Sequence, residues 1–175
     1  MDASRPASGL VVVVPEAEPV VGRCRDRLDP SAALGAPAHV TVLFPFVPAD
    51  ELDDGVLQRL GAAVRAVPAF GYDFRRTDWF DDAVLWLAPT DPLPFHRLTD
   101  LVVAEFPDYP PFEGQFDDVV PHLTVGLGHP RPVLEAAERE LTARLPVTGA
   151  ATEVTVLAQT RPGGRWTRWA TCPLG

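Results

Sequence analysis

The chain has 175 residues, of which 46% are hydrophobic, and it carries a formal net charge of −9. This length fits one domain with a sizeable core, and the hydrophobic content excludes wholesale disorder. Lysine is absent, so all 15 basic residues are arginines. The acidic balance argues against sequence-blind binding to long nucleic acid, which needs a basic surface, but it does not exclude a small phosphorylated ligand held by local groups.

The N-terminal region contains no run that is typical of a signal peptide or a membrane anchor. The apolar run over 10–14 is too short for either, and Pro15 ends it. We therefore expect residues 1–8 to be a disordered tail, and the protein to be cytoplasmic with no membrane partner. Cys24 and Cys172 show neither metal-ligand spacing nor the pattern of a disulfide framework, and Cys24 falls on the apolar side of a predicted helix.

Apolar periodicity predicts strands and helices from residue 9 onward. Runs of β-branched residues and period-two alternation indicate strands, whereas apolar residues at helical spacing indicate amphipathic helices. Asp50 is a candidate N-cap for the second helix. In chain order we predict strand 9–14, helix 17–28, loop 29–37, strand 38–44, helix 51–66, strand 70–74, strand 83–87, helix 94–105, loop 107–118, strand 119–127, helix 132–145, strand 150–159 and strand 165–171, the last two joined by a turn at 163–164.

This order of elements occurs twice. Each half, about 9–80 and 81–175, follows the order β-α-β-α-β, although residues outside one short motif scarcely repeat. A duplication related by a pseudo-two-fold axis would place the middle strands of both halves at equivalent positions, facing one groove. We therefore predict a single domain over 9–175 with two lobes. Strand order and strand direction do not follow from the sequence alone.

The middle strand of each half contains the motif His-x-Thr. The first copy comprises His39 and Thr41, and the second comprises His122 and Thr124, 83 residues further along the chain. Because successive side chains of a strand point to opposite faces, each imidazole shares a face with its hydroxyl and the apolar neighbours share the other face. Two such faces turned toward one groove would supply a pair of histidines and a pair of hydroxyls.

Three interpretations of the paired motif stay open. Each histidine could be structural and hydrogen-bonded to its threonine. The pair could bind a metal ion, but two histidines and two hydroxyls are a poor ligand set for zinc, so we expect no metal and no other cofactor. Thirdly, the pair could carry out acid–base chemistry. His96 and His129 lack a hydroxyl partner, and we expect both at the surface.

Histidine suits acid–base catalysis because its ordinary pKa lies near neutrality. One imidazole could take a proton from an attacking hydroxyl or water while the other gives a proton to the leaving oxygen of a phosphodiester. Each such role contributes typically about 10²–10⁴-fold. Two threonine hydroxyls could bind the non-bridging oxygens as charge builds up. Because the two roles need opposite protonation states, activity should be bell-shaped in pH.

The paired motifs resemble those of the 2H phosphoesterase superfamily. The resemblance is carried by His-Val-Thr-Val at 39–42 and His-Leu-Thr-Val at 122–125. Their flanks, over 38–45 and 121–126, resemble the bacterial 2′-5′ RNA ligase-like (2′,3′-cyclic phosphodiesterase) branch, and so does the segment WFDDAVLWLAP at 79–89. The likeness covers the chain from residue 9 onward.

This resemblance implies an α+β fold with mostly antiparallel sheets around a central groove, the motifs on central strands and the helices outside. It implies metal-independent chemistry on a 2′,3′-cyclic phosphate or a 2′-5′ phosphodiester of a nucleotide or RNA, reversible as 2′-5′ RNA ligation. By position, His39 and His122 would be the acid–base pair, and Thr41 and Thr124 would be the phosphate ligands. Which histidine is the base depends on how the substrate is oriented.

One departure from the family pattern concerns positive charge. Several relatives have a basic residue shortly after the second threonine, and residues 125–128 contain none. Arg161, Arg165 and Arg168, on or near the terminal hairpin, are candidates to supply charge for a longer RNA. The alternative, which the sequence alone favours, is a solvated edge that discourages strand addition. The departure favours hydrolysis of a small cyclic phosphate over ligation of tRNA halves.

Aromatic residues gather around both motifs and offer stacking surfaces for bases. Most are expected in the core. Phe46 and Phe116, close to the two motifs, and Tyr109 are expected to line the groove, and residues 109–118 to fold over it as a lid.

Two other function classes compete with a phosphoesterase. One is a nucleotide- or RNA-binding module that keeps the groove without turnover, and the other is an interaction domain with structural histidines. The presence of both histidines and both threonines favours the enzyme. We expect the partner to be a nucleotide or RNA end with a cyclic phosphate or 2′-5′ link, and the protein to be a monomer without a stable protein partner.

Overall fold

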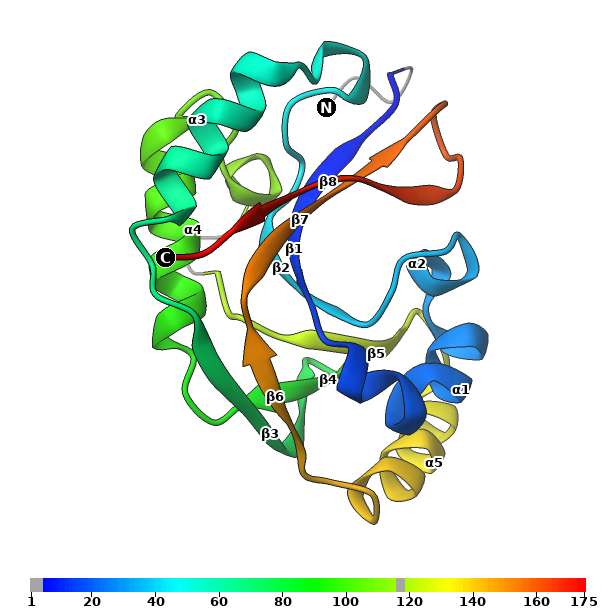
Figure 1. The fold of residues 1–175 in the computed structure, drawn as a ribbon. Helices are drawn as coiled ribbons and strands as arrows, with labels where there is room; N and C mark the ends of the chain where they lie inside the picture. The colour runs from blue at the N-terminus through cyan, green and yellow to red at the C-terminus, as the bar shows by residue number, and fades with distance from the viewer. Residues whose placement is uncertain (1–4, 116–118) are drawn as a thin grey trace.

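The computed structural model describes residues 5–115 and 119–175, which form an α+β fold of two four-stranded antiparallel sheets with helices outside (Figure 1). The strands are β1 (Ser8–Val13), β2 (His39–Leu43), β3 (Phe70–Phe80), β4 (Val84–Pro89), β5 (Leu123–Leu127), β6 (Val147–Ala151), β7 (Glu153–Gln159) and β8 (Trp166–Pro173). The α-helices are α1 (Glu18–Leu28), α2 (Pro30–Ala33), α3 (Asp54–Val64), α4 (Leu93–Glu105) and α5 (Arg131–Thr142), and the short 3-10 helices are η1 (Pro15–Ala17), η2 (Ala49–Glu51) and η3 (Pro111–Gly114).

The two sheets exchange strands between the halves of the sequence. One sheet has the order β2-β1-β7-β8 and the other the order β5-β4-β3-β6. The pair β1–β2 comes from the first half of the sequence and the pair β4–β5 from the second half. Strand β3, from the first half, pairs with β4, and strand β7, from the second half, pairs with β1. The two orders become equivalent when β1, β2, β7 and β8 are matched to β4, β5, β3 and β6, as a pseudo-two-fold relation requires. The halves of the sequence are therefore interlocked and do not coincide with the two sheets.

The longer helices, like β3 and β7, pack against strands from the other half of the sequence. Helix α1 packs against β5 and helix α4 against β2, so each covers the sheet of the other half. Helix α3 lies beside α4 and packs on β8, and α5 packs on β3 and β4 (Figure 1). Each α-helix except the short α2 buries residues at helical spacing; in α5 these are Leu134, Ala137 and Leu141. No helix among the described residues combines the length and the apolar character needed to cross a bilayer.

The predicted elements are found, with corrections at their ends. Strand β1 begins at Ser8, whose buried hydroxyl donates to the carbonyl of Val47, so the expected tail does not extend to residue 8. Asp53, not Asp50, caps α3, because Asp53 accepts a hydrogen bond from the Val56 amide at 2.8 Å. Asp50 lies in η2 and pairs with Arg5 instead.

Two strands differ more from the prediction. Strand β3 continues to Phe80 because its polar second half pairs with β4, after an irregularity in register between Phe74 and Arg76. The predicted strand over 150–159 is two strands, β6 and β7, which join different sheets on either side of Thr152. Because only one residue separates the two strands, the alternation of apolar residues does not reveal where the chain passes from one sheet to the other.

Candidate functional site

The two motif strands meet at the middle of the molecule. Strands β2 and β5 are each the terminal strand of their sheet, and they contact one another where the sheets meet. The motifs therefore lie centrally in the molecule but at sheet edges. His39 is the first residue of β2, and His122 immediately precedes β5, so both imidazoles stand where a strand begins, not in its middle.

Each histidine makes the same hydrogen bond to the backbone two residues earlier. The Nδ1 of His39 lies 2.6 Å from the carbonyl oxygen of Pro37, and the Nδ1 of His122 lies 2.7 Å from that of Val120. Because a carbonyl oxygen only accepts, Nδ1 carries the proton in both rings. The opposite nitrogen, Nε2, is therefore a lone-pair acceptor in the neutral ring and a donor in the cation.

A β-bulge follows the threonine in both motifs. In β2 the register passes from Thr41, opposite Val11, to Leu43, opposite Leu10, which leaves one extra residue in β2. In β5 it passes from Thr124, opposite Trp86, to Gly126, opposite Leu85, again with one extra residue. Bulges bend a strand and redirect side chains, and they are frequent beside active sites. The same irregularity at the same motif position gives both His-Thr pairs the same local geometry.

The threonines keep their hydroxyls available. Thr41 and Thr124 are partly exposed, on the face that carries the motif histidine, while the intervening residues Val40 and Leu123 are buried. In the described ranges, neither hydroxyl has a hydrogen-bond partner. Two hydroxyl donors beside two imidazoles suit an anionic group such as phosphate.

Burial lowers the pKa of both histidines. For His39 it brings the pKa from 6.5 to about 4; the Pro37 carbonyl opposes this shift, the Arg25 guanidinium adds to it and the paired Asp29 carboxylate opposes it. For His122 burial also lowers the pKa, and the Val120 carbonyl opposes the shift. Each ring is therefore neutral near pH 7 in the free protein, and a phosphate bound between them would raise both pKa values.

A buried ion pair supports the loop before His39. Arg25 is 2% exposed and donates through Nε and Nη2 to one carboxylate oxygen of Asp29, at 3.2 and 2.9 Å. Its Nη1 lies 3.3 Å from the carbonyl oxygen of Ala36, and Glu18 accepts from the amide of Ala38. These bonds lie on either side of Pro37, whose carbonyl accepts the hydrogen bond from His39 Nδ1, so the network sets the position of that imidazole.

Aromatic rings support His122 instead. The Phe80 ring meets His122 edge-on, with centroids 4.9 Å apart, and Trp86 lies 5.8 Å away. Phe80 stacks on Trp86 at 4.7 Å. Trp86 pairs with Thr124 across β4 and β5, so the indole occupies the motif face of the sheet.

A cavity of about 190 Å³ adjoins the first motif. His39 and Thr41 form one wall, and aromatic residues form much of the rest. The aromatic lining consists of Phe44, Phe112 and Trp166. Phe44 and Trp166 meet edge-on at 6.0 Å, and the amide of Phe112 donates to the carbonyl of Phe44 at 2.7 Å. This apolar, partly enclosed space beside a histidine and a hydroxyl has the character of a small-molecule site.

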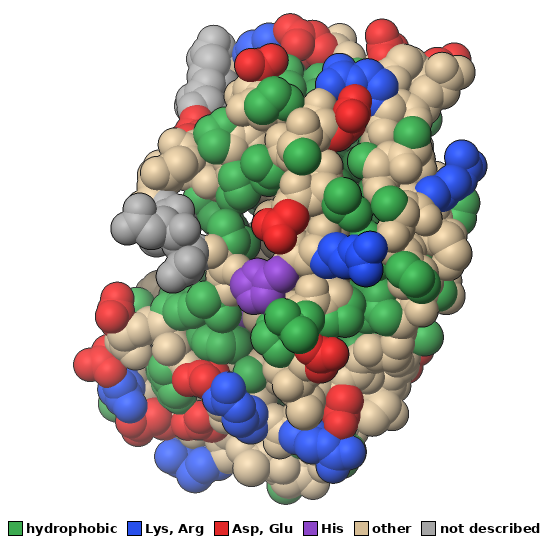
Figure 2. Space-filling model, turned by 90° about the vertical axis from the view of Figure 1, so that its left-hand side faces the viewer, with side chains coloured by type: hydrophobic (Ala, Val, Ile, Leu, Met, Phe, Trp, Pro, Cys, Tyr) green, Lys and Arg blue, Asp and Glu red, His purple; other side chains and the backbone are tan. Residues whose placement is uncertain are grey.

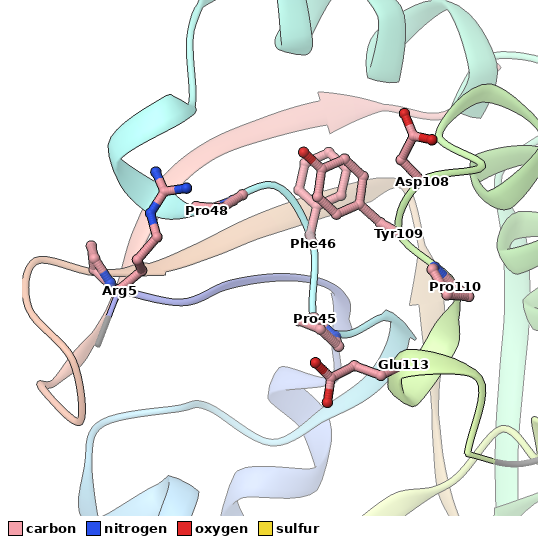
Figure 3. A pocket seen from close by; sticks show the side chains of 9 residues that line it. Arg5, Pro45, Phe46, Pro48, Asp108, Tyr109, Pro110 and Glu113 are labelled. Carbon is pink, nitrogen blue, oxygen red and sulfur yellow. The ribbon is translucent and has the colours of Figure 1, made fainter. Parts of the chain in front are cut away.

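The predicted groove-lining residues lie elsewhere. Phe46 is 2% exposed and packs against Phe106 and Tyr109. Phe46 and Tyr109 line a second cavity, of about 370 Å³, together with Pro45, Pro48 and Pro110 (Figure 3). Both Phe44 and Phe46 lie beyond the end of β2 at Leu43, so strand alternation does not fix their directions; Phe44 lines the cavity beside the first motif, whereas Phe46 is buried against Phe106. Phe116 lies outside the described residues, and so does part of the proposed lid.

Sequence reasoning missed several residues that surround the motifs. Arg25 looked like one of several arginines on an amphipathic helix, and only its burial distinguishes it. Trp86 lies two residues from the start of a strand, and nothing in its spacing connects it with Thr124. Trp166 reaches the site by tertiary contacts, whereas Phe112 belongs to the segment 109–118 that was expected to fold over the groove. The aromatic content of 79–89 was the one available signal.

Comparison with known proteins identifies relatives of the fold. No curated protein matches the chain. E. coli LigT complexed with 3′-AMP has a TM-score of 0.63 at 16% identity, over 97% of this chain and 98% of that one. LigT complexed with NADP+ has a TM-score of 0.61 at 20% identity, over 98% of both chains. TT0787 of Thermus thermophilus has a TM-score of 0.62 at 17% identity, over 95% of this chain and 97% of that one.

These likenesses show a shared fold that extends over nearly the whole length of each chain. A family model is more specific, because it is matched by sequence. The model described as the 2′-5′ RNA ligase superfamily matches residues 13–163, a range that contains both motifs and the strands that carry them. The expected resemblance is thereby confirmed: the chain belongs to the 2′-5′ RNA ligase superfamily.

Proposed function

We propose that the protein is a metal-independent phosphoesterase that opens a 2′,3′-cyclic phosphate, or cleaves a 2′-5′ phosphodiester, of a nucleotide or RNA. The observation that carries this proposal is the matched pair of imidazoles. Each donates its Nδ1–H to a backbone carbonyl, each has Nε2 left for chemistry, and each is followed by a threonine hydroxyl that has no hydrogen-bond partner among the described residues. A structural histidine needs none of this symmetry.

In hydrolysis, His39 acts as the base and His122 as the acid. His39 Nε2 takes a proton from water, and the water oxygen forms a bond to phosphorus. The bond from phosphorus to the 3′-oxygen breaks, and His122 Nε2–H gives its proton to that oxygen, which leaves a 2′-phosphate. Burial lowers the pKa of His39 to about 4 and so favours its neutral form, which suits the base. In ligation the two roles exchange.

The threonines and the aromatic cavity complete the site. Thr41 and Thr124 donate to the non-bridging oxygens as negative charge grows on them. A nucleobase stacks in the cavity lined by Phe44, Phe112 and Trp166. LigT, which shares the fold, occurs in complexes with 3′-AMP, NADP+ and ATP, and this supports a nucleotide as the ligand. The proposal includes action as a monomer in the cytoplasm.

The test is hydrolysis of a panel of nucleoside 2′,3′-cyclic phosphates with EDTA present. The wild type is compared with His39→Ala, His122→Ala and, as a matched control, His96→Ala on α4, with the product identified by NMR. Turnover in EDTA that disappears in the two motif variants and survives in His96→Ala supports the proposal. Binding of nucleotide without any turnover would identify a binding module, and turnover that survives either motif substitution would overturn the site.

A further inference from the structure

The C-terminal hairpin differs in charge from the rest of this acidic chain. Residues 154–175 contain three arginines and no Asp or Glu, whereas the whole chain has a net charge of −9. Arg161, Arg165 and Arg168 are all exposed. Within 5–115 and 119–175, none of the three takes part in an ion pair. We call residues 160–169, which carry these arginines, the basic hairpin.

Strand register places the basic hairpin beside the catalytic cavity. Leu157 and Trp166 both line that cavity. Arg168 lies opposite Leu157 across β7 and β8, and directly opposite residues of an antiparallel pair point to the same face. The Arg168 side chain therefore leaves the sheet on the cavity side.

Arg165 reaches the rim of the cavity from the other end of the basic hairpin. Its Nη2 lies 2.9 Å from where a Cβ on Gly35 would stand. Gly35 precedes Ala36, which lines the cavity. Two unpaired guanidinium groups thus stand at the margin of the site, where the hairpin turn and α2 project on the same side of the molecule (Figure 1).

The basic hairpin is held firmly in this place. Gln159 Nε2 donates to the carbonyl of Gly164 at 2.8 Å, and the amide of Trp166 donates to the carbonyl of Leu34 at 2.8 Å. Trp169 is 41% exposed and is the extra residue at the register irregularity between β7 and β8, so an indole ring is available next to the charges. Unpaired arginines next to exposed aromatic rings are typical of surfaces that bind single-stranded nucleic acid.

The segments next to the motifs supply little other positive charge. The segment after the second motif, residues 125–128, contains no basic residue. Arg25, the arginine close to His39, is buried and paired with Asp29. The face that carries α3 and α4 shows acidic and basic side chains interspersed, with no field of one sign (Figure 2).

We propose that the basic hairpin binds the phosphodiester backbone of a single-stranded RNA whose terminal cyclic phosphate or 2′-5′ link lies between the two histidines. This inference rests on the proposed function and narrows it, because it makes an RNA end the preferred substrate over a free mononucleotide. Arg165 and Arg168 contact phosphates next to the reacting one, and Trp169 stacks with a base.

The first test measures binding, which does not require turnover. A fluorescein-labelled short RNA that ends in a 2′-phosphate is titrated with protein across a series of NaCl concentrations, and anisotropy gives Kd. The variant Arg165→Ala/Arg168→Ala is compared with Arg97→Ala/Arg139→Ala, which removes the same charge from exposed, unpaired positions on α4 and α5. We expect about tenfold weaker binding for the hairpin variant only, and a plot of log Kd against log salt that is shallower by about 1.4, since each lost single-strand phosphate contact removes about 0.7.

Two further measurements separate charge from stacking and from catalysis. Trp169→Ala should weaken RNA binding and leave the salt dependence unchanged. The hairpin variant should raise KM for an RNA with a cyclic phosphate end and leave KM for a mononucleoside cyclic phosphate as it is in the wild type.

The proposal is overturned if the hairpin variant and the control variant weaken binding equally, if wild-type RNA binding does not depend on salt, or if the RNA binds no more tightly than a mononucleotide. A surface that serves a protein partner or only protects a sheet edge would give the last two results. Failure of the proposed function looks different: no cyclic phosphate would be hydrolysed, while the binding comparison would still decide the role of the hairpin.

Discussion

The two motifs are alike in their backbone and different in what stands behind them. Both histidines bond to the carbonyl two residues earlier, and both threonines precede a bulge. Behind His39, however, lies a buried ion pair, whereas His122 is supported by Phe80 and Trp86. The shared backbone gives both imidazoles the same orientation, and under the proposed mechanism the different supports would let one motif act as the base and the other as the acid.

The largest expected effect is the loss of kcat when each motif imidazole is removed in turn. His39→Ala and His122→Ala should each lower kcat by about 10²–10⁴-fold, since a general acid or base typically contributes that much. Single-turnover kinetics on a nucleoside 2′,3′-cyclic phosphate measures the loss. Similar losses in both variants fit a division of labour between the motifs, while a small loss in one of them would show that a single histidine suffices.

The next effect in size is the loss of stability when the buried ion pair behind the first motif is broken. Arg25→Met leaves the buried Asp29 carboxylate without its partner, which should cost about 3–5 kcal/mol in the free energy of unfolding, as for other broken buried pairs. Urea denaturation checks this value. Arg25→Met/Asp29→Leu should recover only part of the stability, because it leaves no buried unpaired charge but also removes the bonds by which Asp29 caps α2. If the single variant proves as stable as the wild type, the ion pair does not support the loop.

The pH dependence tests the difference between the two histidines. The base must be neutral, so kcat/KM should rise with pH through the His39 pKa of about 4. The acid must be protonated, so kcat/KM should fall as pH passes the His122 pKa, which burial places below 6.5. The optimum in kcat/KM therefore lies on the acid side of neutrality, because this parameter reports the free enzyme. An optimum above pH 7 would contradict the assignment.

The smallest effect is expected when the aromatic contact of Phe80 with His122, in the second motif, is removed. Phe80→Leu removes the edge-on contact with His122 and admits water to the ring, so the pKa of His122 should move up toward its ordinary value. We expect about a tenfold loss in kcat, less than the roughly 10²–10⁴-fold that one whole acid–base role contributes. NMR titration of both imidazoles provides the check, with His39 as the internal control. Equal movement of both pKa values would point to a general loosening of the fold.

Local patterns in the sequence predicted much of the fold. The amphipathic spacing in 132–145 and the β-branched run in 9–14 depend on which side chains face the core, so α5 and β1 lie where they were expected. The α+β class and the family resemblance are confirmed on the same basis. Asp50 and Asp53 show the limit of such patterns: both residues can cap a helix, and a tertiary ion pair to Arg5 decides between them.

Within the candidate site, the sequence alone determined which groups are proposed to carry the chemistry, because a His-x-Thr repeat in β-forming runs places imidazole and hydroxyl on one face. Tertiary structure alone decided where those groups lie and what surrounds them. The exchange of β3 and β7 makes both motif strands edges that meet, and tertiary packing places Phe44, not Phe46, in the cavity beside the first motif. Burial of Arg25 and placement of Arg165 and Arg168 depend on contacts between residues far apart in the chain, which side-chain periodicity does not encode.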